Sequence, residues 1–145
     1  IAPTNYSPRH QQVFNGLNNV DLQAFTNRSD ADKQLAEYIQ EAGVRQFLLK
    51  SLAKTDSGFA WRFNLPQLIA SYDNILDKPQ GDAFKKPTLF IKGANSNYIL
   101  EAHRGEITAL FPNAKAKIIA GAGHWLHAEK PSQVNLAIAQ FLSAD

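Results

Sequence analysis

The stretch that decides the fold is Gly121-Ala-Gly-His-Trp-Leu-His-Ala-Glu-Lys-Pro131, a glycine-rich loop that carries a histidine. The apolar run at residues 116–120 predicts a strand that rises to this loop, and Pro131 predicts the first turn of the last helix. Because glycines let the backbone turn sharply at a strand end, the loop brings the imidazole of His124 to the mouth of a cleft. A lone histidine could simply terminate a strand, but the flanking pattern and the helix that follows favour a general base.

The second half of the chain has the pattern of a parallel α/β unit. The run Pro87-Thr-Leu-Phe-Ile-Lys-Gly93 is apolar and bounded by proline and glycine, which predicts a buried parallel strand. A helix over residues 99–111, the strand at 116–120 and a last helix complete a βαβα unit with a right-handed crossover. Two parallel strands do not make a stable sheet, and the chain opens on Ile1 without any methionine. We therefore expect a piece of a longer protein.

The first half has the pattern of short amphipathic helices. Ser7 and the stretch Ser29-Asp-Ala-Asp32 are the expected N-caps of the first two helices. Gly43 is expected to end the second helix, and the apolar stripe of the third helix continues to Leu52. Alternating aromatic residues at 59–63 predict a brief extended segment before a fourth helix.

This organisation predicts an α/β fold in two parts, joined by a linker at residues 78–82. Residues 1–83 form a helical region, and residues 84–145 form the βαβα segment.

Composition bounds the function. Hydrophobic residues make up 44% of the 145, which indicates a globular chain. Fifteen basic and thirteen acidic side chains are interspersed, and no basic patch stands out, so we expect no nucleic-acid partner. The absence of cysteine excludes disulfides and thiolate catalysis. Because the sequence has neither a membrane-spanning apolar run nor the layout of a signal peptide, we expect no membrane partner and a cytoplasmic protein.

Taken together, these segments resemble the C-terminal half of an α/β-hydrolase, and the chain is similar to the YbfF-like bacterial esterases. The resemblance implies a helical cap inserted after the sixth strand, followed by the seventh and eighth strands. It implies hydrolysis of a small carboxylic ester or acyl-thioester by a Ser-His-acid mechanism without a cofactor, with His124 as the catalytic base. The stretches that carry it are Ile1-Ala-Pro, Gly43-Val-Arg-Gln-Phe-Leu-Leu-Lys-Ser51, Trp61-Arg-Phe-Asn-Leu-Pro66, Pro87–Gly93 and Ile119–Pro131.

The chain departs from the family pattern at the nucleophile. The resemblance places a Gly-x-Ser-x-Gly elbow after the fifth strand, and none of the serines here has those flanking glycines. The fragment alone is therefore expected to be inactive. Its expected partners are the missing N-terminal half of the same protein or a second copy, because the strand at 88–92 would otherwise have an unpaired edge.

The triad acid is also in question. The loop after the first strand reads Gly93-Ala-Asn-Ser-Asn97, without the usual aspartate. The resemblance implies that the acid comes from the end of the sixth strand, which would lie just upstream of Ile1. An Asn95-based or acid-free site is the alternative. Ser96 is a candidate for a supporting hydrogen bond near His124, and an ordinary loop serine is the other reading.

Three aromatic residues are candidates for substrate binding: Trp125, Phe47 and Trp61. Packing in the cap or under it is the alternative for each of them. His124, His127 and Glu129 could bind a metal by residue type, but their spacing matches no ligand motif, so we expect no metal site. Glu129 is expected to be a solvated or structural acid.

Two other functions remain open at this point. The same scaffold also hosts C–C bond hydrolases, haloperoxidases and dehalogenases, so the fold does not decide the reaction. A non-catalytic helical binding module would explain the missing nucleophile, although such a module has no need of a histidine at a strand exit.

Overall fold

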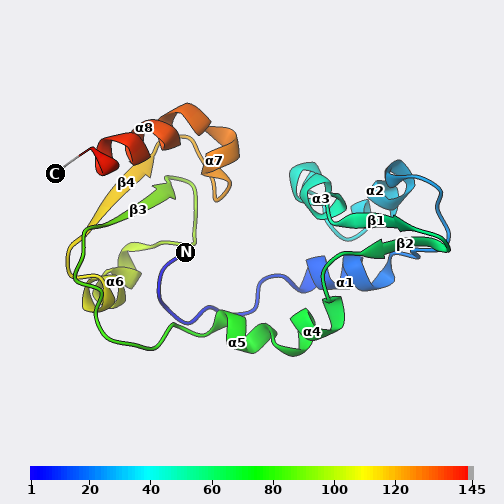
Figure 1. Cartoon of the computed structure of the whole chain (residues 1–145), viewed down its shortest axis with the longest axis horizontal. Helices are drawn as coiled ribbons and strands as arrows, with labels where there is room; N and C mark the ends of the chain where they lie inside the picture. The colour runs from blue at the N-terminus through cyan, green and yellow to red at the C-terminus, as the bar shows by residue number, and fades with distance from the viewer. Residues whose placement is uncertain (144–145) are drawn as a thin grey trace. The chain divides into compact units, whose positions relative to one another are not determined.

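The computed structural model describes residues 1–143, which fold into two compact units (Figure 1). The helical unit comprises Tyr6–Asp77, and the α/β unit comprises Ile1–Asn5 together with the chain from Lys78 onward. None of the helices among residues 1–143 combines the length and apolar character needed to cross a bilayer.

The α/β unit is built on two parallel strands, β3 (Thr88–Gly93) and β4 (Ala114–Ile119). Their register runs from the pair Thr88 and Ala114 to the pair Gly93 and Ile119, so both strands end side by side. The crossover contains a 3₁₀ turn, η1 (Glu101–His103), and helix α6 (Arg104–Leu110). Helices α7 (Leu126–Glu129) and α8 (Pro131–Leu142) follow β4. The predicted parallel βαβα unit is therefore confirmed.

Side chains from the two faces of the strand pair pack on different helices. Ile91 of β3 packs against the buried cluster of Ile119, Ala122 and Val134, and Val134 belongs to α8. Because successive side chains alternate across a strand, Phe90 faces the other way. There it meets Phe111, which directly follows α6, edge to face at 5.4 Å between ring centroids. Figure 1 accordingly shows α8 and α6 on opposite sides of β3 and β4.

The first residues of the chain are part of the α/β unit. The hydroxyl of Thr4, a buried residue, donates to a carboxylate oxygen of Glu106 at 2.9 Å. The amide oxygen of Asn5 accepts from the backbone N–H of Lys78 at 2.7 Å. These two bonds hold the N-terminal segment beside the point where the chain re-enters the unit.

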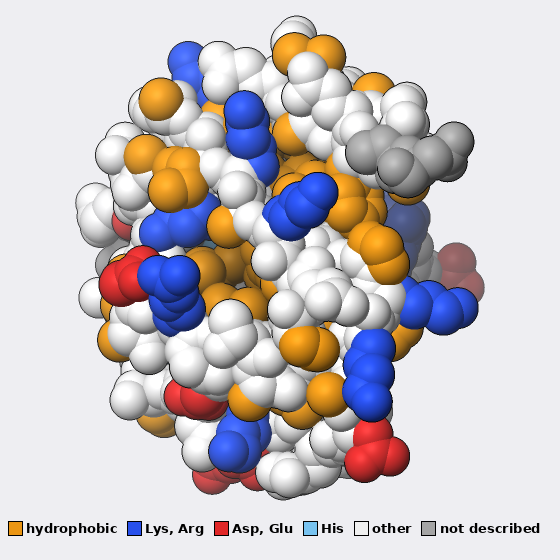
Figure 2. All heavy atoms as spheres, turned by 90° about the vertical axis from the view of Figure 1, so that its left-hand side faces the viewer, with side chains coloured by type: hydrophobic (Ala, Val, Ile, Leu, Met, Phe, Trp, Pro, Cys, Tyr) orange, Lys and Arg blue, Asp and Glu red, His pale blue; other side chains and the backbone are white. Residues whose placement is uncertain are grey.

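On the side of the α/β unit shown in Figure 2, Lys and Arg side chains lie among apolar ones rather than in one patch. The apolar residues that reach the surface of this unit include Ile118 on β4 and Leu142 on α8.

The helical unit contains helices α1 (Gln11–Asn19), α2 (Arg28–Ala36) and α3 (Ala42–Leu49), then a hairpin and two short helices. The hairpin pairs β1 (Leu52–Thr55) with β2 (Gly58–Trp61) in antiparallel register, and α4 (Leu65–Ala70) and α5 (Tyr72–Leu76) follow. Its core is one continuous apolar cluster, with members from all elements except α5: Phe14, Leu17, Val20, Phe25, Ala31, Leu35, Ile39, Leu49, Leu52, Phe59 and Leu65.

The hairpin corrects the predicted end of the third helix. Leu52 does not continue that helix but begins β1, opposite Trp61, and its side chain is fully buried. The turn requires glycine at position 58, where φ is +138° and a Cβ would lie 2.9 Å from the backbone oxygen of Leu22. Gly43 was also misassigned, since it lies inside α3 rather than ending the helix before it.

Two predicted helix starts were misplaced as well. The first helix begins at Gln11 after His10, not at Ser7. The second is capped by Asn27, whose side-chain oxygen accepts from the N–H of Asp30 at 3.1 Å from an extended backbone conformation. The last helix does begin at Pro131, as expected from the rigid φ of proline.

Candidate active site

The loop that carries His124 leaves β4 through a sharp turn. Gly121 has a φ of +65°, a left-handed conformation that glycine adopts without steric cost. The next residue, Ala122, turns inward and is fully buried in the core of the α/β unit. The loop is therefore anchored in the core two residues before His124, whose side chain is exposed in this structure.

The loop after β3 is bonded directly to the His124 loop. The N–H of Ala94 donates to the carbonyl of Ile119, and the N–H of Asn95 donates to the carbonyl of Ala122, each at 2.9 Å. These bonds extend the parallel ladder beyond the strands. At the crossing point, a Cβ on Gly93 would lie 2.1 Å from the carbonyl oxygen of Gly123, which is a severe overlap with backbone. Only glycine at position 93 allows this close approach.

A carboxylate fixes the loop from the other side. One oxygen of Glu129, at the end of α7, accepts a hydrogen bond from the backbone N–H of Gly123 at 2.9 Å. Gly123 immediately precedes His124. This bond identifies Glu129 as a structural acid of the loop.

The imidazole of His124 stacks on the ring of Tyr98, with centroids 3.8 Å apart and ring planes inclined by 19°. Tyr98 lies in the loop after β3. The two loops that carry these rings are therefore the same two loops that are bonded through their backbones. Tyr98 is not among the site residues predicted from the sequence. A tyrosine five residues beyond a strand-ending glycine was the only available signal, and it is weak.

Ser96 and Asn95 occupy the turn that leads to Tyr98. Ser96 is buried, its N–H donates to the carbonyl of Gly93 at 3.1 Å, and its hydroxyl oxygen accepts from the N–H of Tyr98 at 3.3 Å. Asn95 is exposed and contributes its backbone N–H to the bond with Ala122. Both predicted support residues therefore lie in the loop network around His124, and Ser96 bonds to the segment that presents Tyr98.

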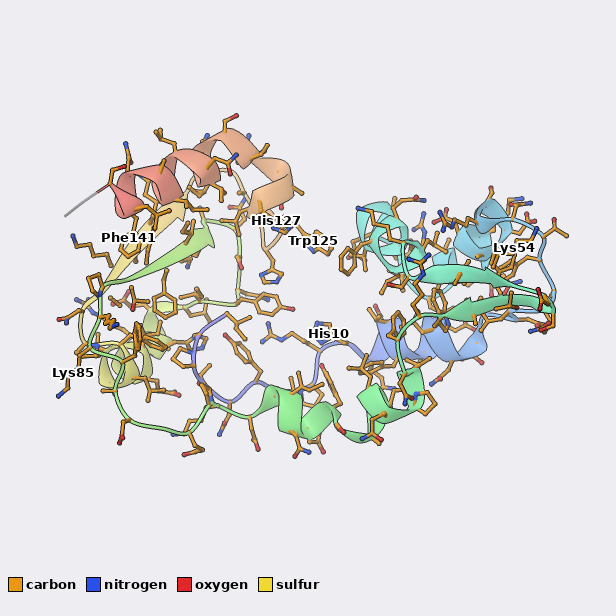
Figure 3. All side chains as sticks on the ribbon, in the orientation of Figure 1. His10, Lys54, Lys85, Trp125, His127 and Phe141 are labelled. Atoms are coloured by element: carbon orange, nitrogen blue, oxygen red, sulfur yellow. The ribbon has the colours of Figure 1, made fainter. Side chains whose placement is uncertain are left out.

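The three aromatic candidates divide between the units. Trp125 is half-buried, follows His124 and stacks on His127 with centroids 5.8 Å apart (Figure 3). Trp61 is in the helical unit, where it stacks on Phe63 at 5.6 Å and donates its indole N–H to the carbonyl of Leu17. Phe47 lies on α3 of the same unit with 51% of its surface exposed.

The acidic and histidine side chains do not assemble into a metal site in the part of the chain that the structure describes. Among residues 1–143, no group of three His, Asp or Glu side chains comes close enough together to hold an ion. Glu129 instead bonds to a backbone N–H.

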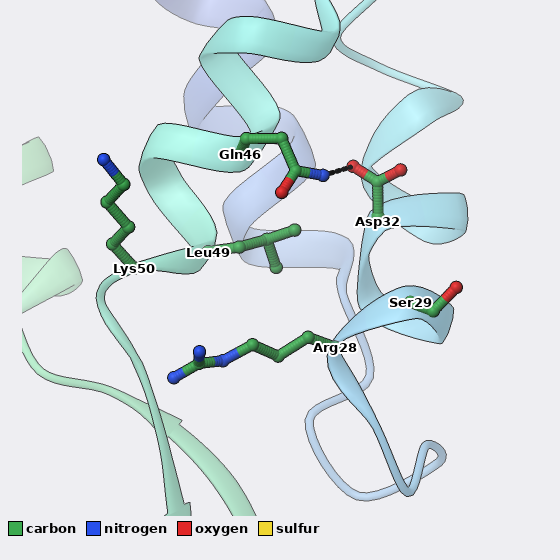
Figure 4. Close-up of a pocket in the computed structure, with 6 residues that line it drawn as sticks. All are labelled: Arg28, Ser29, Asp32, Gln46, Leu49 and Lys50. Atoms are coloured by element: carbon green, nitrogen blue, oxygen red, sulfur yellow. Dashed lines mark hydrogen bonds between the residues drawn. The ribbon is translucent and has the colours of Figure 1, made fainter.

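A separate hollow of about 400 Å³ lies between α2 and α3 of the helical unit (Figure 4). Its polar wall is organised by Asp32, which accepts from Gln46 at 3.3 Å and pairs with Arg45 at 3.0 Å. It contains none of the candidate site residues, so it does not compete with the His124 loop as the candidate site. The residues that line it are Arg28, Ser29, Asp32, Gln46, Leu49 and Lys50.

The arrangement presents one imidazole on a loop fixed at both ends, which suits proton transfer to and from a reacting group. The sequence of this chain contains no Gly-x-Ser-x-Gly elbow, so the site as described presents an imidazole without a serine nucleophile of that type.

Comparison with known proteins places these features in a family. The model of the alpha/beta hydrolase fold matches residues 3–131. Esterase YbfF of Escherichia coli strain K12 is 42% identical over 144 residues, covering 99% of this chain and 55% of that protein. The sn-1-specific diacylglycerol lipase ABHD11 of Mus musculus is 43% identical over 117 residues, covering 80% of this chain and 38% of that protein.

A solved structure, a marine microorganism esterase, superposes with a TM-score of 0.91 at 31% identity, covering 97% of this chain and 57% of that one. The chain thus spans about half the length of esterase YbfF and of this solved esterase. Because the family model covers most of the chain and the fold superposes closely on a solved esterase, the chain belongs to the α/β-hydrolase fold family.

Proposed function

We propose that the protein to which this chain belongs hydrolyses carboxylic esters or acyl-thioesters, with His124 as its general base. The observation that carries the proposal is the loop geometry. His124 follows the parallel strand β4 on a turn whose backbone is bonded to the end of the neighbouring strand β3. The chain that contains this turn is similar to esterases and to a lipase.

His124 has two tasks in this reaction. It takes the proton of the serine hydroxyl as the serine oxygen attacks the acyl carbon, and it gives that proton to the departing alcohol or thiol. Water then attacks the acyl-enzyme, with the same imidazole accepting and returning a proton, and releases the carboxylic acid. The step needs no cofactor and no metal.

The remaining groups are proposed to come from the other half of the protein. The serine and the backbone donors of the oxyanion hole belong to segments that this chain does not contain. We place the triad acid there too, with Asn95 as the alternative partner of His124 inside this chain. The helical unit would serve as the cap, and Trp125, Phe47 and Trp61 are proposed to contact the acyl substrate.

The unpaired edge of β3 is the proposed binding site for the other half of the protein. Among residues 1–143, β3 pairs with β4 along one edge only, and its apolar residues Leu89 and Ile91 are half-buried. An unpaired edge of this kind favours pairing with another strand. We propose a strand of the N-terminal half as that partner, with a second copy of the chain as the alternative.

The test uses the full-length protein and a series of p-nitrophenyl esters from acetate to octanoate, with acyl-thioesters as a second series. His124→Ala should lower kcat by at least about a thousandfold, because removal of a triad member leaves only the residual contribution of binding and the oxyanion hole. His103→Ala, in the crossover, is the matched control and should retain kcat within about threefold. Near-normal turnover by His124→Ala would refute the assignment.

Two further measurements on the same full-length protein distinguish the alternative reactions. Covalent capture of the full-length protein by a fluorophosphonate that is blocked by prior substrate would support a serine nucleophile. Halide release from a haloalkane without ester turnover would favour dehalogenase chemistry instead.

A further inference from the structure

The position of His124 depends on a short backbone segment with few internal bonds. Gly121, Ala122 and Gly123 precede it, and two of these three residues are glycines, which restrict the backbone least. A catalytic imidazole displaced by about 1 Å can cost on the order of a hundredfold in rate. The segment therefore needs an external constraint close to His124.

Glu129 supplies such a constraint from beyond the histidine. Helix α7 turns the chain back, with the N–H groups of Ala128 and Glu129 donating to the carbonyl of Trp125 at 2.8 and 2.9 Å. This single turn returns the Glu129 carboxylate to Gly123, whose N–H it accepts at 2.9 Å. This hydrogen bond closes a loop of residues 123–129, and His124 is one of the residues in that loop.

Both carboxylate oxygens lie over the glycine. A Cβ built on Gly123 would be 3.2 Å from one oxygen and 3.8 Å from the other. The acid thus covers the backbone next to His124, and the bond is charge-assisted, which makes it stronger than a bond between neutral groups.

We propose that Glu129 is a positioning residue for His124, acting through the N–H of Gly123, and that it is not the acid of the triad. This inference rests on the function proposed above. Glu129 is the acid of this chain nearest to His124 in sequence. Its proposed task depends on the length of its side chain and on hydrogen-bond acceptance, not on direct contact with the imidazole.

The experiment compares Glu129→Leu, Glu129→Asp and Glu129→Gln in the full-length protein. Leucine cannot accept the bond, and aspartate keeps the charge but is one methylene too short to reach Gly123 from the same backbone. Both should lower kcat by roughly ten- to a hundredfold, since misorientation of the base is the expected fault, while KM changes less than about threefold. Glutamine retains the reach and the accepting oxygen, so Glu129→Gln should remain within about threefold of the parent.

Glu101 provides the matched control, because its exposed carboxylate pairs with Arg104 at 3.2 Å on the surface of the same unit. Glu101→Leu and Glu101→Gln should leave kcat unchanged. Melting temperatures of all variants identify any that fail to fold. If Glu129→Leu is one of them, Glu129→Asp decides.

Two outcomes would overturn the inference. A loss of about ten-thousandfold in Glu129→Gln would make Glu129 the triad acid, since an acid-to-amide change in a triad has an effect of that size. Wild-type kcat in Glu129→Asp or in a folded Glu129→Leu would remove the positioning role. Failure of the proposed function looks different, because the parent would then lack ester turnover or His124→Ala would retain it.

Discussion

Replacing Gly93 by alanine tests how closely the site depends on the crossing of its two loops. Gly93 ends β3, and its Cα faces the backbone of the His124 loop. A Cβ there would lie 2.1 Å from the oxygen of Gly123, 2.4 Å from the oxygen of Ala122 and 2.7 Å from the carbonyl carbon of Ala122. All three atoms belong to backbone, so no side-chain rotation relieves the overlap.

The size of the effect follows from these distances. Real Cβ contacts essentially never fall below 3.0 Å, so the loops must separate by at least about 0.9 Å. The two bonds nearest the overlap, from Ala94 to Ile119 and from Asn95 to Ala122, are then stretched or broken. Overpacking costs about 1–3 kcal/mol and the loss of one of these two bonds about 1 kcal/mol, which gives roughly 2–4 kcal/mol in the free energy of unfolding. In a domain of 150–250 residues this corresponds to a fall of roughly 5–15 °C in the melting temperature.

The same displacement carries His124 with it. We expect kcat of the full-length Gly93→Ala variant to fall on the order of a hundredfold at a temperature where the variant is still folded. Gly105→Ala is the control, because a Cβ at that position in α6 meets nothing within 4 Å and alanine favours the helix. A Gly93→Ala variant with the parent's melting temperature and kcat would refute the reasoning, because the crossing would then have to be wider than the structure has it.

Three further predictions follow from other contacts. Tyr98→Leu removes the ring stacked on His124 and should lower kcat by roughly three- to tenfold, the equivalent of about 0.5–1.5 kcal/mol. Tyr98→Phe keeps an aromatic ring and should not lower kcat. Equal kcat in both variants would contradict a role for the stack. The pKa of His10 lies below its ordinary value of 6.5 because the ring is partly buried and Arg9 is adjacent. As the pH falls, the unfolded chain therefore binds a proton at His10 before the folded chain does. The melting temperature should fall as the pH drops below about 6.5, and it should fall less in His10→Asn. Parallel pH curves of the melting temperature for the two proteins would exclude His10 as the source of the effect. The 145-residue chain alone should hydrolyse p-nitrophenyl acetate no faster than free imidazole at equal concentration, and turnover abolished by a serine-directed phosphonate would show that this chain holds a nucleophile after all.

The two strands of the α/β unit were predictable because each is an apolar run with clear ends. Proline and glycine bound β3, and the glycine-rich loop ends β4, so the parallel pair could be read from the sequence. The hairpin of the helical unit was not predictable in the same way. Leu52 continues a helical spacing of apolar residues, and only its pairing with Trp61 across the turn at Gly58 makes it a strand residue. Long-range pairing overrode the local pattern.

The site shows the same division. His124 could be selected because its signal lies in consecutive residues. Tyr98 and Gly93 could not, because their roles depend on the register that brings the end of β3 beside the end of β4. Glu129 was expected to be a structural or solvated acid, but its partner depends on the single helical turn of α7, which the sequence does not specify.

Four residues that contact His124 or hold its loop belong to the α/β unit: Gly93, Tyr98, Ala122 and Glu129. We therefore expect these four residues to act on the orientation of His124. Phe47 and Trp61 of the helical unit are the proposed substrate contacts. Under this division, changes at Phe47 should alter KM and the preferred acyl length while the pH dependence of kcat stays fixed. Changes at Gly93 or Glu129 should lower kcat for every ester alike.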